Sequence, residues 1–273
     1  MKTILVTGSS GQLGQELHEL SADFLNYNFI FASRELLDIS NKTSVDNFFA
    51  ENKIDFCLNC AAYTAVDKAQ DDRESCWKIN SGGVENLAKA CNTHNSVLIH
   101  ISSDYVFDGT KTAPYLETDA TNPINYYGQT KLEGENFALK NNPKTFVIRT
   151  SWVYSKKYGK NFYKTILRLA AEKEEIQIVS DQTGCPTDAK DLAKILLKIV
   201  EKVNSEKNFK DFGIYNYSGS QIQSWFDFAK KIVSENKLSC TILPIPSNNY
   251  PTPAKRPAYS VLSCKKIDKL FSI

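Results

Sequence analysis

The sequence contains a serine, a tyrosine and a lysine whose types and spacing suit the reduction of a carbonyl group. Tyr127 and Lys131 are four residues apart, so on a helix they lie on one face, one turn apart. A tyrosine phenol has an ordinary pKa of about 10, and a neighbouring ammonium lowers that pKa. We expect Ser103 to hydrogen-bond a substrate carbonyl while Tyr127 protonates its oxygen. A nicotinamide cofactor would deliver hydride to the carbonyl carbon.

Two alternatives accompany this interpretation. A tyrosine and a lysine at this spacing also occur together on ordinary surface helices. Tyr126 is a second candidate acid, but a step of four residues from it reaches Thr130, which carries no charge. The catalytic interpretation is favoured because the chain also begins with a turn that suits a cofactor.

That turn is rich in glycine, directly follows an apolar segment and opens a helical one. Gly8, Gly11 and Gly14 form a GxxGxxG pattern that includes Gln12 and Leu13. Glycine lets the backbone turn sharply and approach a pyrophosphate, which the amides and dipole of a helix N-terminus attract. We predict that these five residues bind a dinucleotide; a plain tight turn is the alternative.

The end of the second predicted strand bears on the choice of cofactor. It carries Ser33, Arg34 and Glu35, without the acid that usually holds the ribose hydroxyl and repels a 2′-phosphate. Ser33 and Arg34 suit such a phosphate, so NADPH is predicted over NADH, which stays the alternative because Glu35 is adjacent. Asp38 and Ile39 are expected to close over the adenine, unless Asp38 only caps a loop or helix.

Small residues follow the third predicted strand. Ala61 and Ala62 stand where the backbone of such a sheet passes close to its ligand. We expect both of them, and the next residue Tyr63, to contact the cofactor.

The elements that must position these residues alternate between strands and helices. Apolar segments predict strands at 3–7, 28–32, 55–59, 97–101 and 145–148, and helical patterns lie between them at 12–22, 43–52, 71–94 and 124–140. Such alternation predicts an α/β fold, a Rossmann-type doubly wound parallel sheet with a smaller C-terminal substrate-binding lobe. We expect residues 1–150 to form the dinucleotide-binding domain. Residues 151–273 should form mainly the substrate lobe, with some segments returning to the first domain.

Five prolines crowd into 14 residues near the end of the chain, at positions 244, 246, 251, 253 and 257. Proline is excluded from helix interiors and central strands, so this tract is predicted to be an extended loop. A loop of this length suits either ligand binding or a plain connection.

Composition excludes several classes of function. The net charge is +2, from 33 basic and 31 acidic side chains, without a basic stripe, so neither nucleic acid nor a membrane surface is an expected partner. No apolar run approaches the length of a membrane span, and because the first residues run directly into a predicted strand we expect no signal peptide. Seven cysteines, an odd number, suit buried thiols in a reducing cytoplasm. Cys57 and Cys60 have metal-like spacing but are expected to be core residues.

The motifs together resemble a known family. The chain is similar to the extended short-chain dehydrogenases/reductases and, among them, to the dTDP-4-dehydrorhamnose reductase family. Beyond the glycines and the catalytic residues, the resemblance covers nearly the whole chain and lies in NCAAYTAVDKA at 59–69, SDYVFDG at 103–109, YGQTKLEGE at 127–135, RTSWVY at 149–154, DQTGCPT at 181–187 and YPTPAKRP at 250–257.

The resemblance implies reduction of the 4-keto group of a nucleotide sugar, dTDP-4-dehydro-L-rhamnose, to dTDP-L-rhamnose. It implies that Trp152 lies over the sugar, that Asp104 and Tyr105 line the pocket, and that Arg256 meets the diphosphate. Each has an alternative role: Trp152 as a core aromatic, Arg256 as a surface cation and Asp104 as a cap.

The sequence departs from the family in two places. Ser103 stands where the family usually has threonine, and either residue supplies the hydroxyl. Some members are homodimers bridged by magnesium; Glu16 and Asp191 match two of the acids, and the third has no counterpart. We therefore predict no metal site, and a homodimer is left open.

Two rival functions are weighed against the reductase. One is an epimerase or dehydratase of the same superfamily, which would recycle its nicotinamide and consume no net NADPH. A dehydratase needs an additional acid–base pair beside the catalytic hydroxyl, whereas the segment after Ser103 offers a single acid, Asp104. A non-catalytic NADP-binding regulatory subunit would not need Ser103, Tyr127 and Lys131 together.

Overall fold

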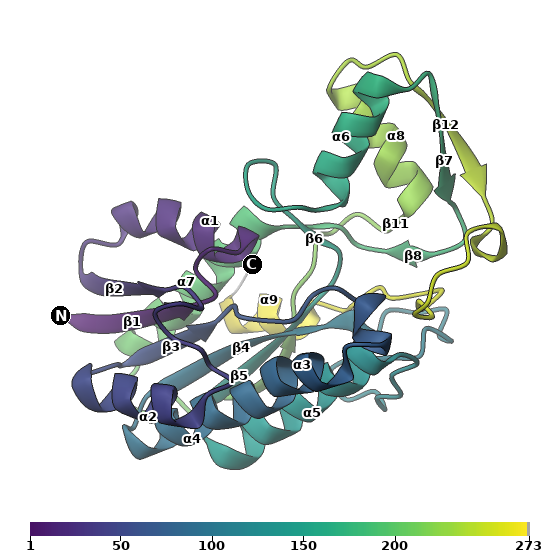
Figure 1. Ribbon diagram of the computed structural model, residues 1–273. Coiled ribbons are helices and arrows are strands. Elements are labelled where there is room, and N and C mark those ends of the chain that lie inside the picture. Colours follow the sequence, from purple (N-terminus) through teal and green to yellow (C-terminus); the bar gives the residue numbers. More distant parts are fainter. Residues whose placement is uncertain (272–273) are drawn as a thin grey trace.

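The centre of the protein is a six-stranded sheet in which every pair of neighbouring strands is parallel (Figure 1). The computed structural model describes residues 1–271; residues 272–273, the end of the expected substrate half, lie outside it. The strand order is β10-β5-β4-β3-β1-β2, and the strands span β1 (Lys2–Thr7), β2 (Tyr27–Ala32), β3 (Phe56–Asn59), β4 (Val97–Ser103), β5 (Thr145–Thr150) and β10 (Gly213–Asn216). The predicted doubly wound parallel sheet is thus confirmed.

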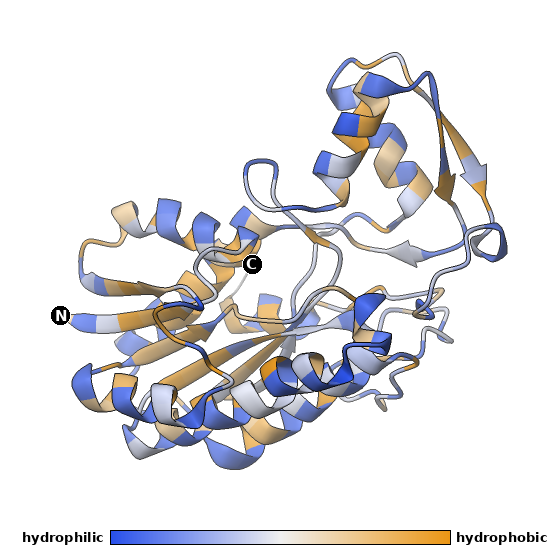
Figure 2. Cartoon of the chain, in the orientation of Figure 1, coloured by the Kyte–Doolittle hydropathy of each residue, from blue (hydrophilic) through white to orange (hydrophobic). Residues whose placement is uncertain are grey.

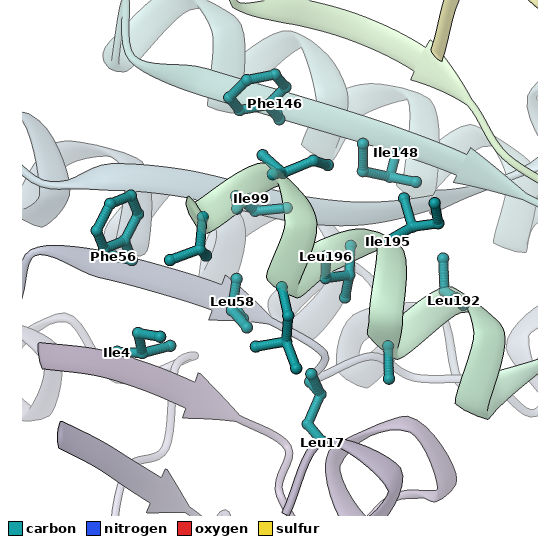
Figure 3. Packing of buried hydrophobic residues seen from close by; sticks show 14 of the residues in the cluster. Ile4, Leu17, Phe56, Leu58, Ile99, Phe146, Ile148, Leu192, Ile195 and Leu196 are labelled. Atoms are coloured by element: carbon teal, nitrogen blue, oxygen red, sulfur yellow. The ribbon is translucent and has the colours of Figure 1, made fainter. Parts of the chain in front are cut away.

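Helices cover both faces of this sheet. One face packs against α1 (Gln12–Leu20), α7 (Ala189–Ser205) and α9 (Lys265–Phe271), and the other against α2 (Lys42–Glu51), α4 (Gly83–Thr93) and α5 (Tyr126–Asn141). Figure 2 shows why the strands lie inside, because their residues are mostly hydrophobic. In Figure 3, Leu192, Ile195 and Leu196 of α7 lie over apolar side chains of the sheet. This packing buries strand residues on both faces.

The long helix predicted at 71–94 is interrupted. It consists of α3 (Arg73–Trp77), a π-helical turn (Lys78–Gly82) and α4. The π turn carries Asn80, whose amide accepts from the backbone nitrogen of Tyr63 at 2.9 Å and donates to its carbonyl at 3.0 Å. The interruption therefore ties this helix to the segment after β3. Short 3-10 turns lie at Ser21–Asp23, Lys68–Gln70, Asp104–Val106 and Ser247–Asn249.

A smaller lobe is built from the second half of the chain. It contains α6 (Phe162–Glu172), α8 (Trp225–Glu235) and the parallel pair β7 (Glu175–Val179) and β12 (Thr241–Ile245), with a hydrophobic cluster of its own. Two short ladders join it to the sheet, β6 (Val153–Tyr154) with β9 (Thr187–Asp188) and β8 (Thr183–Gly184) with β11 (Gln223–Ser224). The chain forms α6 and β7 of the lobe, returns to the sheet for α7 and β10, and then enters the lobe again for α8 and β12 (Figure 1).

The proline tract differs from the prediction at its start. Pro244 lies inside β12, where it pairs with Ile178 of β7. The ladder of β7 and β12 has only two strands, so both are edge strands, which tolerate a proline. From Pro246 onward the tract is loop apart from a 3-10 turn, as expected. None of the helices in residues 1–271 is long and apolar enough to cross a membrane.

Candidate active site

The strand order reverses direction between β1 and β3, and this is where the predicted cofactor residues gather. β1 lies between β2 and β3, while the following strands extend the sheet on the β3 side. The carboxyl ends of β1 and β3 therefore form a crevice, the usual ligand site of such sheets. The glycine-rich turn follows β1, and Ala61 and Ala62 follow β3.

The geometry of the glycine-rich turn explains its residue types. Gly8 has a φ of 63°, and a Cβ there would stand 2.6 Å from the backbone nitrogen of Ala61. A Cβ on Gly14 would stand 2.5 Å from the Cα of Ser9, so this glycine lets α1 pack directly on the turn. Gly11 caps α1 without a side-chain hydrogen bond to the helix amides. The uncapped N-terminus and the close backbone approach fit a dinucleotide pyrophosphate.

The residues after β2 have partners of their own. The Nε atom of Arg34 lies 3.9 Å from the Asp38 carboxylate, and its side chain is 76% exposed. Asp38 accepts from the backbone nitrogen and the hydroxyl of Ser40, at 3.0 and 2.7 Å. These hydrogen bonds shape the loop around Asp38. Ile39 is buried and would contact a Cβ at Gly83.

Most of the predicted residues line one cavity of about 1750 Å³. Ligand sites for one drug-sized molecule occupy roughly 300–1,000 Å³, so this space suits two ligands side by side. From the cofactor set, the cavity is lined by Gly8, Gly11, Gln12, Leu13, Arg34, Asp38, Ile39, Ala61 and Ala62, and from the catalytic and substrate sets by Ser103, Asp104, Tyr105, Tyr127, Lys131, Trp152 and Arg256. Gly14, Ser33 and Tyr63 lie outside this lining, and the Tyr63 hydroxyl instead donates to Asp72 at 3.1 Å.

Two elements, β4 and α5, bring the catalytic candidates together. Ser103 ends β4, and Tyr127 and Lys131 occupy the first two turns of α5, whose cap is Asn125. The side-chain oxygen Oδ1 of Asn125 accepts from the Gly128 amide at 2.8 Å. A Cβ at Gly128 would stand 2.2 Å from the Tyr105 carbonyl oxygen, so glycine lets α5 approach the segment after β4. All three side chains are buried.

Burial controls the protonation of these groups. It raises the pKa of Tyr127 well above its ordinary value, while a hydrogen bond with the Ser103 hydroxyl opposes that shift. The net shift is therefore opposite to the lowering expected from Lys131, because burial dominates it. Burial also lowers the pKa of Lys131 to about 8, and its ammonium donates to the Ile101 carbonyl at 2.6 Å. The phenol thus carries its proton at neutral pH, as a general acid must.

A buried ion pair lies one helical turn beyond the lysine. Glu135 receives three hydrogen bonds of 2.7 to 3.2 Å from the Arg149 guanidinium and one of 2.5 Å from the Ser102 hydroxyl. Its negative charge raises the pKa of Lys131 and so opposes the effect of burial. Glu135 is a residue that the sequence analysis did not single out.

Two predicted substrate residues lie beside the catalytic hydroxyls. Asp104 is buried and receives hydrogen bonds from Ser103, at 3.0 Å, and from Ser260. Burial raises its pKa to about 6 in spite of these hydrogen bonds. The ring of Tyr105 meets that of Tyr127 edge to face, with centroids 5.5 Å apart.

The other two predicted substrate residues are held by partners far away in sequence. The Trp152 indole stacks on Trp225, with ring centroids 3.4 Å apart. Arg256, in the proline tract, forms two hydrogen bonds of 2.7 and 3.1 Å with the Asp67 carboxylate. Arg256 is thus an anchored cation of the cavity wall, and the pair ties the tract to the segment after β3.

A loop that the sequence analysis did not single out, residues 155–161 between β6 and α6, lies against Gln12 of the glycine-rich turn. Asn161 and the Val153 carbonyl both hydrogen-bond the Gln12 side chain, at 3.1 Å each. Gly159 has a φ of 67°, and a Cβ there would stand 3.0 Å from the Cβ of Gln12. Gly159 and Lys160 also line the cavity. Only the tertiary structure places this loop, because no local motif links it to α1.

The residues considered for metals have other roles. Glu16 accepts a hydrogen bond of 2.5 Å from the Ser155 hydroxyl. Residues 1–271 contain no group of three or more histidine, cysteine or acidic side chains arranged to hold a metal ion. Cys57 and Cys60 are free thiols, and burial raises the pKa of Cys60 well above its ordinary value. A raised pKa disfavours the thiolate that metal binding and redox chemistry need.

A doubly wound sheet with a glycine-rich turn at its crevice, beside a buried serine, tyrosine and lysine, defines a nicotinamide-dependent oxidoreductase of the short-chain dehydrogenase/reductase type. Comparison with known proteins narrows the class. The family model described as RmlD substrate binding domain matches residues 1–273. A dTDP-4-dehydrorhamnose reductase of Aggregatibacter actinomycetemcomitans is 41% identical, over 100% of this chain and 94% of that protein.

Two solved structures agree with these matches. A dTDP-4-dehydrorhamnose reductase of Clostridium acetobutylicum superposes with a TM-score of 0.92 at 39% identity, covering 99% of this chain and 92% of that one. A dTDP-4-dehydrorhamnose reductase of Bacillus anthracis, in complex with NADP, has a TM-score of 0.93 at 37% identity, covering 100% and 94%. This chain belongs to the dTDP-4-dehydrorhamnose reductase family.

Proposed function

We infer that this protein reduces the 4-keto group of dTDP-4-dehydro-L-rhamnose to give dTDP-L-rhamnose, with NADPH as the reductant. The name of the relatives points to the substrate, and the NADP complex of one of them points to the cofactor. The observation that carries the chemistry is the convergence of Ser103, Tyr127 and Lys131 on the cavity that the glycine-rich turn also lines. Binding and reaction therefore share one space.

Each catalytic side chain has a distinct part in the proposed reaction. When bound, the cofactor supplies the hydride that adds to the carbonyl carbon. The Ser103 hydroxyl hydrogen-bonds the carbonyl oxygen, and Tyr127 passes its phenolic proton to that oxygen as negative charge develops on it. The Lys131 ammonium stabilises the phenolate that remains. The buried setting excludes water and strengthens these interactions.

The binding roles extend to the rest of the cavity wall. We propose that Gly8, Gly11, Gln12 and Leu13 hold the pyrophosphate and that Arg34 meets the 2′-phosphate. Asp38, Ile39, Ala61 and Ala62 would flank the nucleoside, and Asp104, Tyr105, Trp152 and Arg256 the nucleotide sugar, because all of these residues line the same cavity. Residues 1–150 then act as the dinucleotide-binding domain, and the lobe within 151–273 supplies the substrate side.

The cellular setting is proposed from the same residues. All seven cysteines are free thiols, which supports a reducing compartment, the cytoplasm. The homodimer considered from the family resemblance stays a prediction, which sedimentation of the purified protein would test.

The reaction is tested by following NADPH oxidation on dTDP-4-dehydro-L-rhamnose generated in situ. The wild type should oxidise NADPH in proportion to the sugar supplied. Tyr127→Phe should lose at least about a hundredfold in kcat, the usual contribution of a general acid, while still binding NADPH. Tyr126→Phe is the matched control, because the neighbouring phenol lies over Arg73 and should be dispensable.

Three results would contradict the proposal. Equal activity of Tyr127→Phe and wild type would exclude the phenol as the acid. Conversion of a nucleotide sugar without net NADPH consumption would favour an epimerase. Binding of NADPH without turnover of any keto sugar, together with co-purification of a larger enzyme, would favour a regulatory subunit.

A further inference from the structure

The indole of Trp152 is held on two sides by residues from other parts of the chain. Trp225 covers one face, with ring centroids 3.4 Å apart and planes 5° from parallel. Gly184 lies at the edge of the ring, since a Cβ there would stand 2.6 to 2.8 Å from three indole atoms. Both tryptophans line the cavity. Trp152 is therefore fixed in orientation, although it is not part of the hydrophobic clusters.

The backbone at Trp152 needs such support. Its φ of 50° lies in the left-handed region, which is strained for a residue with a side chain. The residue stands between the end of β5 at Thr150 and the start of β6 at Val153, where the chain leaves the sheet for the lobe. Its carbonyl accepts from the Thr187 amide at 3.2 Å. The strained turn directs the side chain into the cavity wall.

Trp225 is a well-anchored support. It begins α8, and its neighbour Ser224 caps that helix in a reciprocal pair of hydrogen bonds with Asp227. Phe162 of α6 also packs on Trp225, with ring centroids 4.5 Å apart. In the ladder of β11 and β8, Gln223 pairs with Gly184, so the same two strands place both residues that hold the indole.

We propose that Trp225 is a positioning residue for substrate recognition, which fixes the Trp152 indole against the nucleotide sugar while Gly184 leaves room for its edge. The proposal rests on the function inferred above. Trp225 acts through Trp152, so its loss should weaken binding of the sugar rather than the hydride transfer or NADPH binding. The stack also joins the sheet, through Trp152, to the lobe, through α8.

The experiment combines kinetics with the NMR signals of the indole N–H groups. The chain has three tryptophans, so wild type should give three indole cross-peaks, and Trp77→Phe assigns one of them. In Trp225→Leu the Trp152 cross-peak should move, because a stacked ring shifts its neighbour's resonance. The KM for the keto sugar should rise about tenfold, about 1.4 kcal/mol, with kcat and the Kd for NADPH changed less than about threefold. Trp77→Phe is the control and should keep wild-type kinetics, since Trp77 lies on α3 and donates to Glu133.

Two further variants test the same proposal if Trp225→Leu does not fold. Trp225→Phe retains a flat ring and should restore most of the affinity. Gly184→Ala intrudes on the indole from its edge and should raise KM by a similar factor with Trp225 intact. An unchanged KM while the Trp152 cross-peak moves would overturn the proposal. An equal loss of kcat, NADPH binding and thermal stability would also overturn it, by showing a purely structural role. Failure of wild type to bind dTDP-L-rhamnose would instead refute the substrate assignment itself.

Discussion

Asp104 should destabilise the folded protein at neutral pH, and replacing it by asparagine should reverse this effect. The carboxyl is 2% exposed, and burial raises its pKa from 3.8 to about 6. Between these two values the folded state binds more protons than the unfolded state, so the free energy of unfolding falls as the pH rises through this window. A shift of about two pKa units corresponds to about 3 kcal/mol.

Asp104→Asn keeps the size of the side chain and removes the titration. We expect the variant to be more stable than wild type by about 3 kcal/mol at pH 7, with the difference fading towards zero near pH 4, where Asp104 is neutral in the folded protein. Urea unfolding at several pH values, followed by circular dichroism, measures the difference. If Asp104 contacts the sugar as proposed, the stabilised variant should also bind it more weakly.

Asp108→Asn is a control of opposite sign. Hydrogen bonds from the amide and hydroxyl of Thr110 hold the pKa of Asp108 at about 2, below its ordinary 3.8. The stability that this carboxylate contributes is present above pH 4 and lost as the pH falls towards 2, so the variant should be less stable at pH 7. The reasoning fails if Asp104→Asn is no more stable than wild type at pH 7, or if its advantage does not depend on pH.

Other substitutions test the remaining parts of the site. Glu135→Gln leaves Arg149 buried without its carboxylate and should lower the free energy of unfolding by about 3–5 kcal/mol in urea titrations; a loss under about 1 kcal/mol would contradict the importance of the pair. The alkaline limb of the pH profile of kcat/KM should lie near pH 8, where Lys131 loses its proton. Glu135→Gln should move this limb to lower pH, because the carboxylate raises the pKa of Lys131. A limb that does not move would exclude this coupling. Gly8→Ala should abolish NADPH binding in titration calorimetry, since its Cβ would meet Ala61. Gly213→Ala is the control for backbone strain alone: its φ is 132°, but its Cβ would meet no atom within 4 Å, so the variant should lose stability and still bind NADPH. Arg34→Gln should raise the KM for NADPH and leave that for NADH unchanged; equal changes would refute its contact with the 2′-phosphate.

The parts of the fold that could be predicted from the sequence depend on short-range patterns. The strands from β1 to β5 and the helices between them follow from apolar segments and helical periodicity, and their ends fall within a few residues of the predictions. Gly8 and Gly14 were recognisable because only glycine permits their close backbone contacts. Tyr127 and Lys131 share a helix face for the same local reason.

Other features depend on residues that no local pattern connects. The π turn that carries Asn80 looked like uninterrupted helix, and Pro244 was expected in a loop although an edge strand accommodates it. The pKa of Tyr127 was expected to fall beside Lys131, but its surroundings are assembled from β4 and α5, and burial there raises it.

By itself, the sequence determined the class of fold and predicted the glycine-rich turn and the pair of Tyr127 and Lys131 as candidate site residues, because each of these depends on patterns among residues close together in the chain. Only the tertiary structure decided which contacts hold the cavity-lining side chains in place. The stack of Trp225 on Trp152, the pair of Arg256 with Asp67 and the loop over Gln12 all join residues far apart in the chain. Such contacts form when the lobe packs against the sheet, and their geometry depends on that packing rather than on any local preference.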